Sequence, residues 1–266
     1  MITFFVSNTC FNTVCANTYK DTDQKEQRKW EMSAQHSCSF SMKLLLIMVT
    51  LAWPAGLRAF AFPDGEAIAP SVLPNDNRRP AGEMRDGTLR LSLRAALGSW
   101  RPEAEDGPAL EVEAFGEVTG PLQVPAPLIR VREGTAILAS IRNDLQTPLQ
   151  VHGLCARAGS PCPVLDVPSG ETRQVLFTSN SPGTYYYWAT TTGMPLAFRG
   201  STDAQLSGAF IVDSAEAEPV PDRILVITEW TSLTRAQLAE VVSQPDPGDA
   251  FLRLKPKTLF AVNGQA

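Results

Sequence analysis

Asn143-Asp144-Leu145-Gln146-Thr147-Pro148-Leu149-Gln150-Val151-His152-Gly153-Leu154 is the most informative run of residues in this sequence. A second run of the same kind is Ser181-Pro182-Gly183-Thr184-Tyr185-Tyr186-Tyr187-Trp188-Ala189-Thr190. In both, Pro and Gly residues punctuate short segments of apolar and aromatic residues, which is typical of strands between turns. The two runs therefore predict β-strands at Leu149–Leu154 and Gly183–Ala189.

The same strand signal recurs on both sides of these runs. Leu89, Leu91 and Leu93 alternate with polar residues, as in a strand that buries one face. The other predicted strands are Val112–Phe115, Leu128–Val131, Ala136–Arg142, Glu171–Phe177, Gly208–Val212 and Arg223–Ile227. Many short strands separated by turn residues favour an all-β antiparallel sandwich or barrel over an α/β fold.

One segment has the features of a helix. Thr234–Val242 is rich in good helix formers and begins with a residue that can cap a helix. Pro245 and Pro247 follow it, so we expect the helix to end there and Gln244–Asp249 to be a linker.

Length, composition and charge set broad limits on function. The 266 residues are 44% hydrophobic and 19% charged, which is ordinary for a globular protein. The formal net charge of −5 argues against nucleic acid as a partner, because that class of protein needs a basic surface.

The N-terminal quarter resembles a secretory signal behind an unrelated extension. Met42–Ala61 contains a lysine, a short apolar run and small residues near its end, which predicts a cleaved signal peptide and an exported protein, periplasmic or extracellular. A buried or anchoring N-terminal helix is the alternative. The unbroken apolar run is far shorter than the roughly 20 residues that span a bilayer. We expect residues 1–41 to be a wrongly assigned extension and residues 62–86 to be a disordered leader.

Cys155 and Cys162 are the two cysteines after the predicted signal. A nearby pair in an oxidising compartment is a candidate disulfide. Two free thiols in a loop are an equal alternative, because spacing does not establish the geometry that a disulfide requires.

Several motifs together resemble a known family. The segments are Ala126–Val131, Gly134, Asn143–Leu145, Pro148, His152–Leu154, Gln205–Val212, Ile224–Trp230 and Phe260–Gln265. In this order they are similar to the first cupredoxin domain of multicopper oxidases, the laccase-like family, over roughly residues 110–265. The resemblance implies a Greek-key cupredoxin β-sandwich at 87–230, a helical linker at 231–250 and the start of a second cupredoxin domain at 251–266.

The family also implies copper, further cupredoxin domains of the same polypeptide as partners, and oxidation of a small-molecule substrate coupled to dioxygen reduction. Its copper ligands come from a His-x-His-Gly motif and a later His-x-His motif. In this chain those four positions are Gln150, His152, Trp188 and Thr190. Because copper in such sites prefers converging imidazoles, His152 is the one candidate metal ligand here. A structural histidine, hydrogen-bonded through one ring nitrogen, is the favoured alternative.

The aromatic residues of the second run also have two interpretations. In a strand, Tyr185 and Tyr187 share one face, and Tyr186 and Trp188 share the other. Packing in the core explains them more simply than a surface that stacks against a substrate. If Trp188 and Thr190 replace lost ligands, we expect Trp188 to fill the space and Thr190 to be hydrogen-bonded.

Two hypotheses of function follow. The first is the N-terminal part of an exported multicopper oxidase-like protein, inactive as this chain. The second is a noncatalytic binding or structural module that has kept the cupredoxin fold without copper, since a fold does not by itself determine a function.

Overall fold

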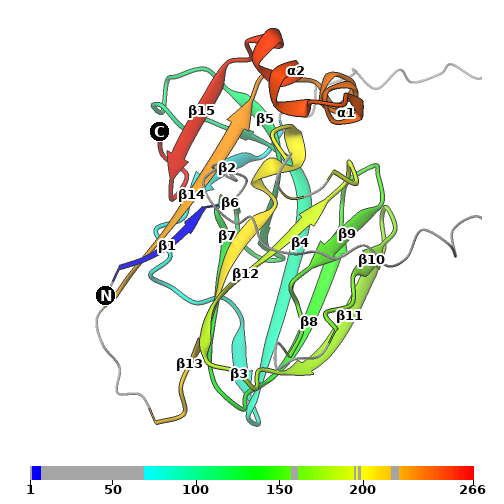
Figure 1. Cartoon of the computed structure of the whole chain (residues 1–266). Coiled ribbons are helices and arrows are strands. Elements are labelled where there is room, and N and C mark those ends of the chain that lie inside the picture. The colour runs from blue at the N-terminus through cyan, green and yellow to red at the C-terminus, as the bar shows by residue number, and fades with distance from the viewer. Residues whose placement is uncertain (1, 7–68, 157–160, 195, 197–198, 217–221) are drawn as a thin grey trace, which may run out of the picture. The chain divides into compact units, whose positions relative to one another are not determined.

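A computed structural model describes residues 2–6, 69–156, 161–194, 196, 199–216 and 222–266 (Figure 1). The predicted signal peptide at 42–61, most of the predicted extension and the first part of the predicted leader lie outside these residues. Within the described ranges, no helix is long and apolar enough to cross a membrane.

The described chain is dominated by strands, which confirms the predicted all-β class. The strands are β1 (Ile2–Val6), β2 (Ser71–Pro74), β3 (Glu83–Arg85), β4 (Thr88–Trp100), β5 (Leu110–Glu117), β6 (Leu122–Val124), β7 (Ala126–Arg132), β8 (Ala136–Asn143), β9 (Leu149–His152), β10 (Leu165–Val167), β11 (Thr172–Thr178), β12 (Gly183–Thr190), β13 (Ser207–Asp213), β14 (Arg223–Thr231) and β15 (Thr258–Val262). The helices are η3 (Thr202–Gln205, a 3₁₀ turn), α1 (Arg235–Ser243) and α2 (Pro247–Leu254).

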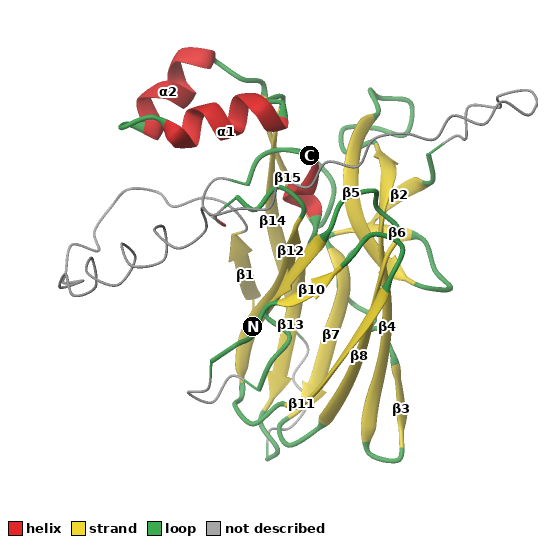
Figure 2. Ribbon diagram, turned by 90° about the vertical axis from the view of Figure 1, so that its right-hand side faces the viewer, coloured by secondary structure: helices red, strands yellow, loops and turns green. Residues whose placement is uncertain are grey.

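Two sheets enclose the main core. One has the strand order β10-β9-β12-β13-β7, and the other has the order β11-β8-β4-β2-β6-β5 with β3 added beside β4. Figure 2 shows β12, β13 and β7 on one side and β8 and β4 on the other. The core takes fully buried side chains from both sheets, among them Leu93, Ile141, Val151, Tyr187 and Phe210. Burial of this apolar surface is the main force that holds the sheets together.

The sheets are mixed, so the prediction of an antiparallel sandwich is wrong in this respect. β13 pairs with β7 in parallel, as do β4 with β8 and β2 with β4 and β6. Alternation of apolar residues shows which face of a strand is buried. It does not show which strand lies beside it, because long connections carry the chain from one sheet to the other.

Three short strands lie within the segments predicted to be a leader and an extension. Residues 71–74 form β2, and Val72 is buried against the core that contains Trp100. Residues 83–85 form β3, a hairpin partner of β4. Residues 2–6 form β1, which pairs in parallel with β14. Strands this short show too little alternation to be recognised from sequence.

The C-terminal region confirms one predicted helix and adds another. Thr234 caps α1 in a reciprocal capping box with Gln237. The predicted linker at 244–249 is wrong in part, because Pro247 begins α2 instead of ending α1. Proline is well tolerated in the first turn of a helix, where its missing N–H has no intrahelical partner anyway.

The last strand packs on the described domain. β15 pairs antiparallel with β14, and its Leu259 and Ala261 are buried beside Trp100. The Trp100 indole Nε1 donates a hydrogen bond to the Gly264 carbonyl oxygen at 3.1 Å. Strand β15, which lies in the segment 251–266 predicted to begin a second domain, therefore contributes to this core.

Candidate functional site

The four predicted copper-ligand positions lie together on two neighbouring strands. β9 and β12 are antiparallel, with Trp188 opposite His152 and Thr190 opposite Gln150. Side chains two residues apart on a strand point to the same face. The residues between them, Val151 and Ala189, belong to the core, so all four positions are on the opposite face of the sheet.

A buried asparagine sets the start of β9. Asn143 donates from its side-chain amide to the carbonyl oxygens of Thr147 and Val167, both at 2.9 Å. Its Oδ1 accepts from the Leu145 backbone N–H at 3.0 Å. The Asn-Asp-Leu motif therefore holds the turn that delivers Gln150 and His152 to the site.

His152 is stacked on Trp188. The two rings are nearly parallel, at 5°, with centroids 3.9 Å apart. Burial lowers the pKa of His152 below its ordinary value, and the positive charge of Arg199 lowers it further, against the opposing effect of Asp166. The imidazole is consequently neutral at neutral pH.

Thr190 is buried and belongs to a hydrogen-bonded turn. Its hydroxyl donates to Asp203 Oδ2 at 2.6 Å and accepts from the backbone N–H groups of Thr192 and Gly193 at 3.1 and 3.0 Å. The Thr192 hydroxyl donates to the same Asp203 oxygen at 2.7 Å. Asp203 is fully buried, and these donors stabilise its charge. Thr190 is therefore hydrogen-bonded, as predicted from the sequence.

Gln150 lies at the exposed edge of the group. Its Nε2 donates to Asp166 Oδ1 on the adjacent strand β10 at 3.1 Å. The pair is a surface contact across two strands.

Arg199 is the member of the site that sequence reasoning missed. Its side chain is almost completely buried, and its guanidinium carbon lies 5.0 Å from the centroid of the Trp188 ring. Burial lowers the pKa of Arg199 to about 10, against the opposing effect of Asp203, so the side chain remains charged at neutral pH. No signal in the sequence identifies it, because arginine is usually exposed.

The donor set does not fit copper. Indole has no free electron pair for a metal, and Thr190 is occupied by its hydrogen bonds. Across the described ranges, no group of three or more His, Cys, Asp or Glu side chains is placed to hold a metal ion. His152 supplies one imidazole, and the nearby guanidinium repels a cation. The arrangement can pack and orient the two strands, but it lacks the ligands for copper chemistry.

Cys155 and Cys162 are joined by a disulfide, with their Cα atoms 5.4 Å apart. Cys155 is buried just after the end of β9. The bond closes the loop that follows His152, and it leaves no thiolate beside the imidazole to act as a second ligand.

The tyrosines of β12 serve mainly in packing. Tyr187 is fully buried beside Phe115, and its hydroxyl donates to the Pro127 carbonyl oxygen at 2.6 Å. Tyr185 packs partly against the same core, and Tyr186 contacts a smaller cluster on the other face. This is the predicted division of faces.

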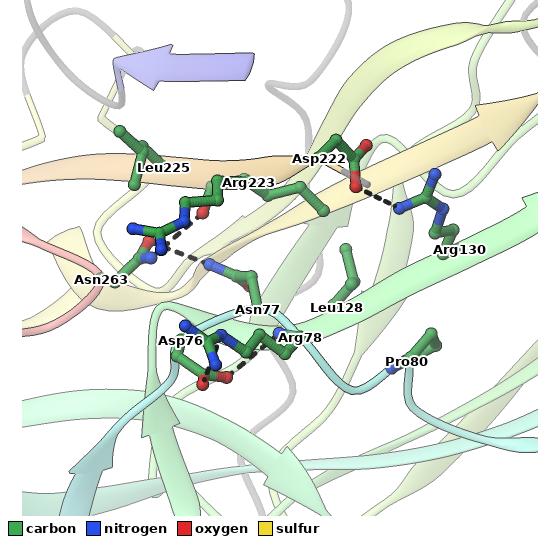
Figure 3. Close-up of a pocket in the computed structure, with 11 residues that line it drawn as sticks. Asp76, Asn77, Arg78, Pro80, Leu128, Arg130, Asp222, Arg223, Leu225 and Asn263 are labelled. Atoms are coloured by element: carbon green, nitrogen blue, oxygen red, sulfur yellow. Dashed lines mark hydrogen bonds and ion pairs between the residues drawn. The ribbon is translucent and has the colours of Figure 1, made fainter. Parts of the chain in front are cut away.

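A separate hollow of about 530 Å³ lies between the 76–80 loop, β7 and β14 (Figure 3). Arg130 makes two hydrogen bonds to Asp213 at 2.8 and 2.9 Å and one to Asp222 at 2.9 Å. The hydrogen bonds to Asp213 and Asp222 raise the pKa of Arg130. Arg78 pairs with Asp76 at 3.3 Å. Because these charges are matched within the protein, they hold the strands and loop in place.

A family model matches the central region of the chain. Residues 118–217 match the family model described as multicopper oxidase, a range that includes Gln150, His152, Trp188, Thr190 and Arg199. The resemblance to multicopper oxidases is thus confirmed for this part of the chain.

The relatives are distant and longer. A probable nitrite reductase-hydroxylamine oxidoreductase fusion protein of Kuenenia stuttgartiensis is 28% identical over 161 residues, 54% of this chain and 18% of that protein. The copper nitrite reductase of Nitrosomonas europaea is 21% identical with a TM-score of 0.45, covering 67% of this chain and 57% of that one. A multicopper oxidase structure is 18% identical with a TM-score of 0.47, covering 75% and 61%. The chain therefore spans less than two thirds of each of these relatives.

Proposed function

We propose that residues 87–230 are a noncatalytic cupredoxin module of a multicopper oxidase-like protein, in which a former copper half-site has become a packed structural element. The observation that carries this proposal is the stack of His152 on Trp188 with Arg199 beside it. Thr190 supports the proposal, because its hydroxyl donates a hydrogen bond to the buried Asp203 carboxylate.

Copper titration tests the proposal. We expect the purified 266-residue chain, after incubation with copper and desalting, to retain less than stoichiometric metal by elemental analysis. A matched His152→Gln variant should retain the same small amount. Stoichiometric copper in the unmodified chain, lost in His152→Gln, would contradict the proposal.

A second candidate function is copper-dependent oxidation of a small substrate coupled to dioxygen reduction, with other cupredoxin domains of the same polypeptide supplying the metal ligands. The match to the multicopper oxidase family favours it. It predicts copper-dependent oxygen consumption by a polypeptide that joins this chain to such domains, which the copper-free module does not predict.

We also propose that the protein is exported. The disulfide between Cys155 and Cys162 supports it, because such bonds persist in oxidising compartments. Cell fractionation with thiol alkylation tests it, and a protein found in the cytoplasm with both thiols free would contradict it.

A further inference from the structure

Arg199 places a permanent positive charge beside the positions where the family holds a metal. The guanidinium carbon is 5.0 Å from the Trp188 ring, and Trp188 stacks on His152 with 3.9 Å between centroids. Trp188 and Thr190 lie on the same face of β12 as this contact. The guanidinium therefore lies beside the Trp188 position, on the face of the sheet where histidines would bind a cation.

The backbone holds Arg199 in this position. The carbonyl oxygen of the next residue, Gly200, accepts hydrogen bonds from both the backbone N–H and the hydroxyl of Thr231, each at 2.8 Å. A Cβ atom at Gly200 would lie 2.8 Å from the Thr231 hydroxyl oxygen, so only glycine allows this approach. At the other end, Arg199 Nη2 donates to the Asp203 backbone carbonyl oxygen.

The carboxylates of Asp203 and Glu113 offset part of the charge of Arg199, but they do not hydrogen-bond to all of its donors. Among the described residues, its Nε and Nη1 have no hydrogen-bond partner, and neither has Asp203 Oδ1. The Asp203 carboxylate directs its other oxygen to the threonines of the 190–192 turn instead of to the guanidinium. A buried cation with spare donors repels another cation strongly, because little solvent screens the interaction.

We infer that Arg199 is a metal-excluding residue, a cation built into the chain that takes the place of the metal charge at the former half-site. The inference rests on the proposed function and deepens it. If the missing ligands were the only obstacle to copper binding, three histidine substitutions would restore the site. With Arg199 present, Coulomb repulsion of a divalent ion held at the Trp188 position should weaken binding by at least about 100-fold.

The test restores the ligands in the 266-residue chain and varies only the charge. Three proteins carry Gln150→His, Trp188→His and Thr190→His together, one with Arg199 retained, one with Arg199→Met and one with Arg199→Lys. Methionine is similar in length but neutral, and lysine keeps the charge. Calorimetric titration with Cu²⁺ and elemental analysis measure binding, and circular dichroism checks folding.

We expect the Arg199→Met protein to bind copper at least about 100-fold more tightly than the Arg199 and Arg199→Lys proteins. Equal affinity in the three proteins, or no binding in any of them, would overturn the role of Arg199. Neither result contradicts the proposed function. The proposed function is contradicted only if the unmodified chain binds stoichiometric copper.

A second pair covers the case in which Thr190→His prevents folding. Trp188→His alone creates a cross-strand pair of imidazoles with His152, and it leaves Thr190 bonded to Asp203. This variant is compared with Trp188→His, Arg199→Met for Cu²⁺ affinity. Tighter binding with methionine supports the inference, and unchanged affinity overturns it.

Discussion

Thr190 illustrates how a single residue changes the role of a position. A histidine there would present a ring nitrogen, whereas the threonine hydroxyl donates to the buried Asp203 carboxylate at 2.6 Å. The same hydroxyl accepts hydrogen bonds from two backbone N–H groups of the following turn. Hydrogen bonds to a buried charge are among the stronger ones in proteins, so the turn depends on this residue.

Replacing Thr190 by valine should lower the free energy of unfolding by about 1–3 kcal/mol, because the shape is kept while Asp203 and two backbone groups lose a partner. Urea unfolding followed by fluorescence measures the change. Gln150→Ala, at the exposed cross-strand neighbour, is the control and should change stability by less than about 0.5 kcal/mol. Equal effects of the two substitutions would show that the buried network contributes nothing.

Trp188→His should destabilise the domain by about 1–3 kcal/mol, since it removes apolar contact with His152 and the cation–π contact with Arg199. It should not create tight copper binding, because at most two imidazoles then converge. Thermal unfolding with and without copper measures both effects. Tight copper binding with an unchanged melting temperature would mean that the position is an open, preformed metal site.

At the scale of elements, the turn that follows β15 holds this C-terminal strand against the rest of the domain. After β15, Gly264 has a φ of +83°, and a Cβ there would lie 2.1 Å from the Val124 carbonyl oxygen. The Trp100 indole also donates to the Gly264 carbonyl oxygen. Close backbone approach and a left-handed conformation both require glycine at this position.

Gly264→Ala should therefore destabilise the protein more than Gly134→Ala. Gly134 has the same φ of +83°, but its Cβ would meet nothing within 4 Å. The control should cost about 1–2 kcal/mol, the strain of a left-handed residue. Gly264→Ala should lower stability by more than this, and it should expose the segment after α2 to protease. Equal melting temperatures for the two variants would show that the contact with Val124 yields easily.

At the scale of the whole molecule, stability should depend on pH through His152. Burial and Arg199 lower its pKa in the folded state, so the unfolded chain takes up the proton more readily. The neutral ring therefore contributes to the free energy of unfolding above the ordinary pKa of about 6.5. This contribution is lost as the pH falls below that value toward the folded-state pKa.

We expect the melting temperature to fall between about pH 7.5 and about pH 5, and to fall less in His152→Phe, which keeps a ring against Trp188 but cannot take up a proton. Differential scanning calorimetry at both pH values measures this. An equal decrease in both proteins would show that carboxylates elsewhere account for the pH dependence.

Local patterns in the sequence were sufficient to predict most of the strands. β4, β8 and β12 lie where alternation of apolar residues indicated them, and Thr234 begins α1 as its capping chemistry predicted. Alternation is a property of neighbouring residues, so it can be recognised without knowledge of the fold. The prediction that Pro247 belongs to a linker is wrong. Proline both ends helices and begins them, and only the surrounding chain distinguishes the two roles.

The sequence by itself determined the all-β class, the faces of β12 and the loss of three histidines from the four family positions. Only the tertiary structure decided what replaced them. In the sequence, Arg199 and Asp203 lie 11 and 15 residues after Trp188, and 47 and 51 residues after His152, by subtraction of their numbers. No spacing rule connects them. Strand pairing and the Gly200–Thr231 contact bring the guanidinium to the indole ring. The interactions of a buried charge depend on separation in space, which the order of residues along the chain does not specify.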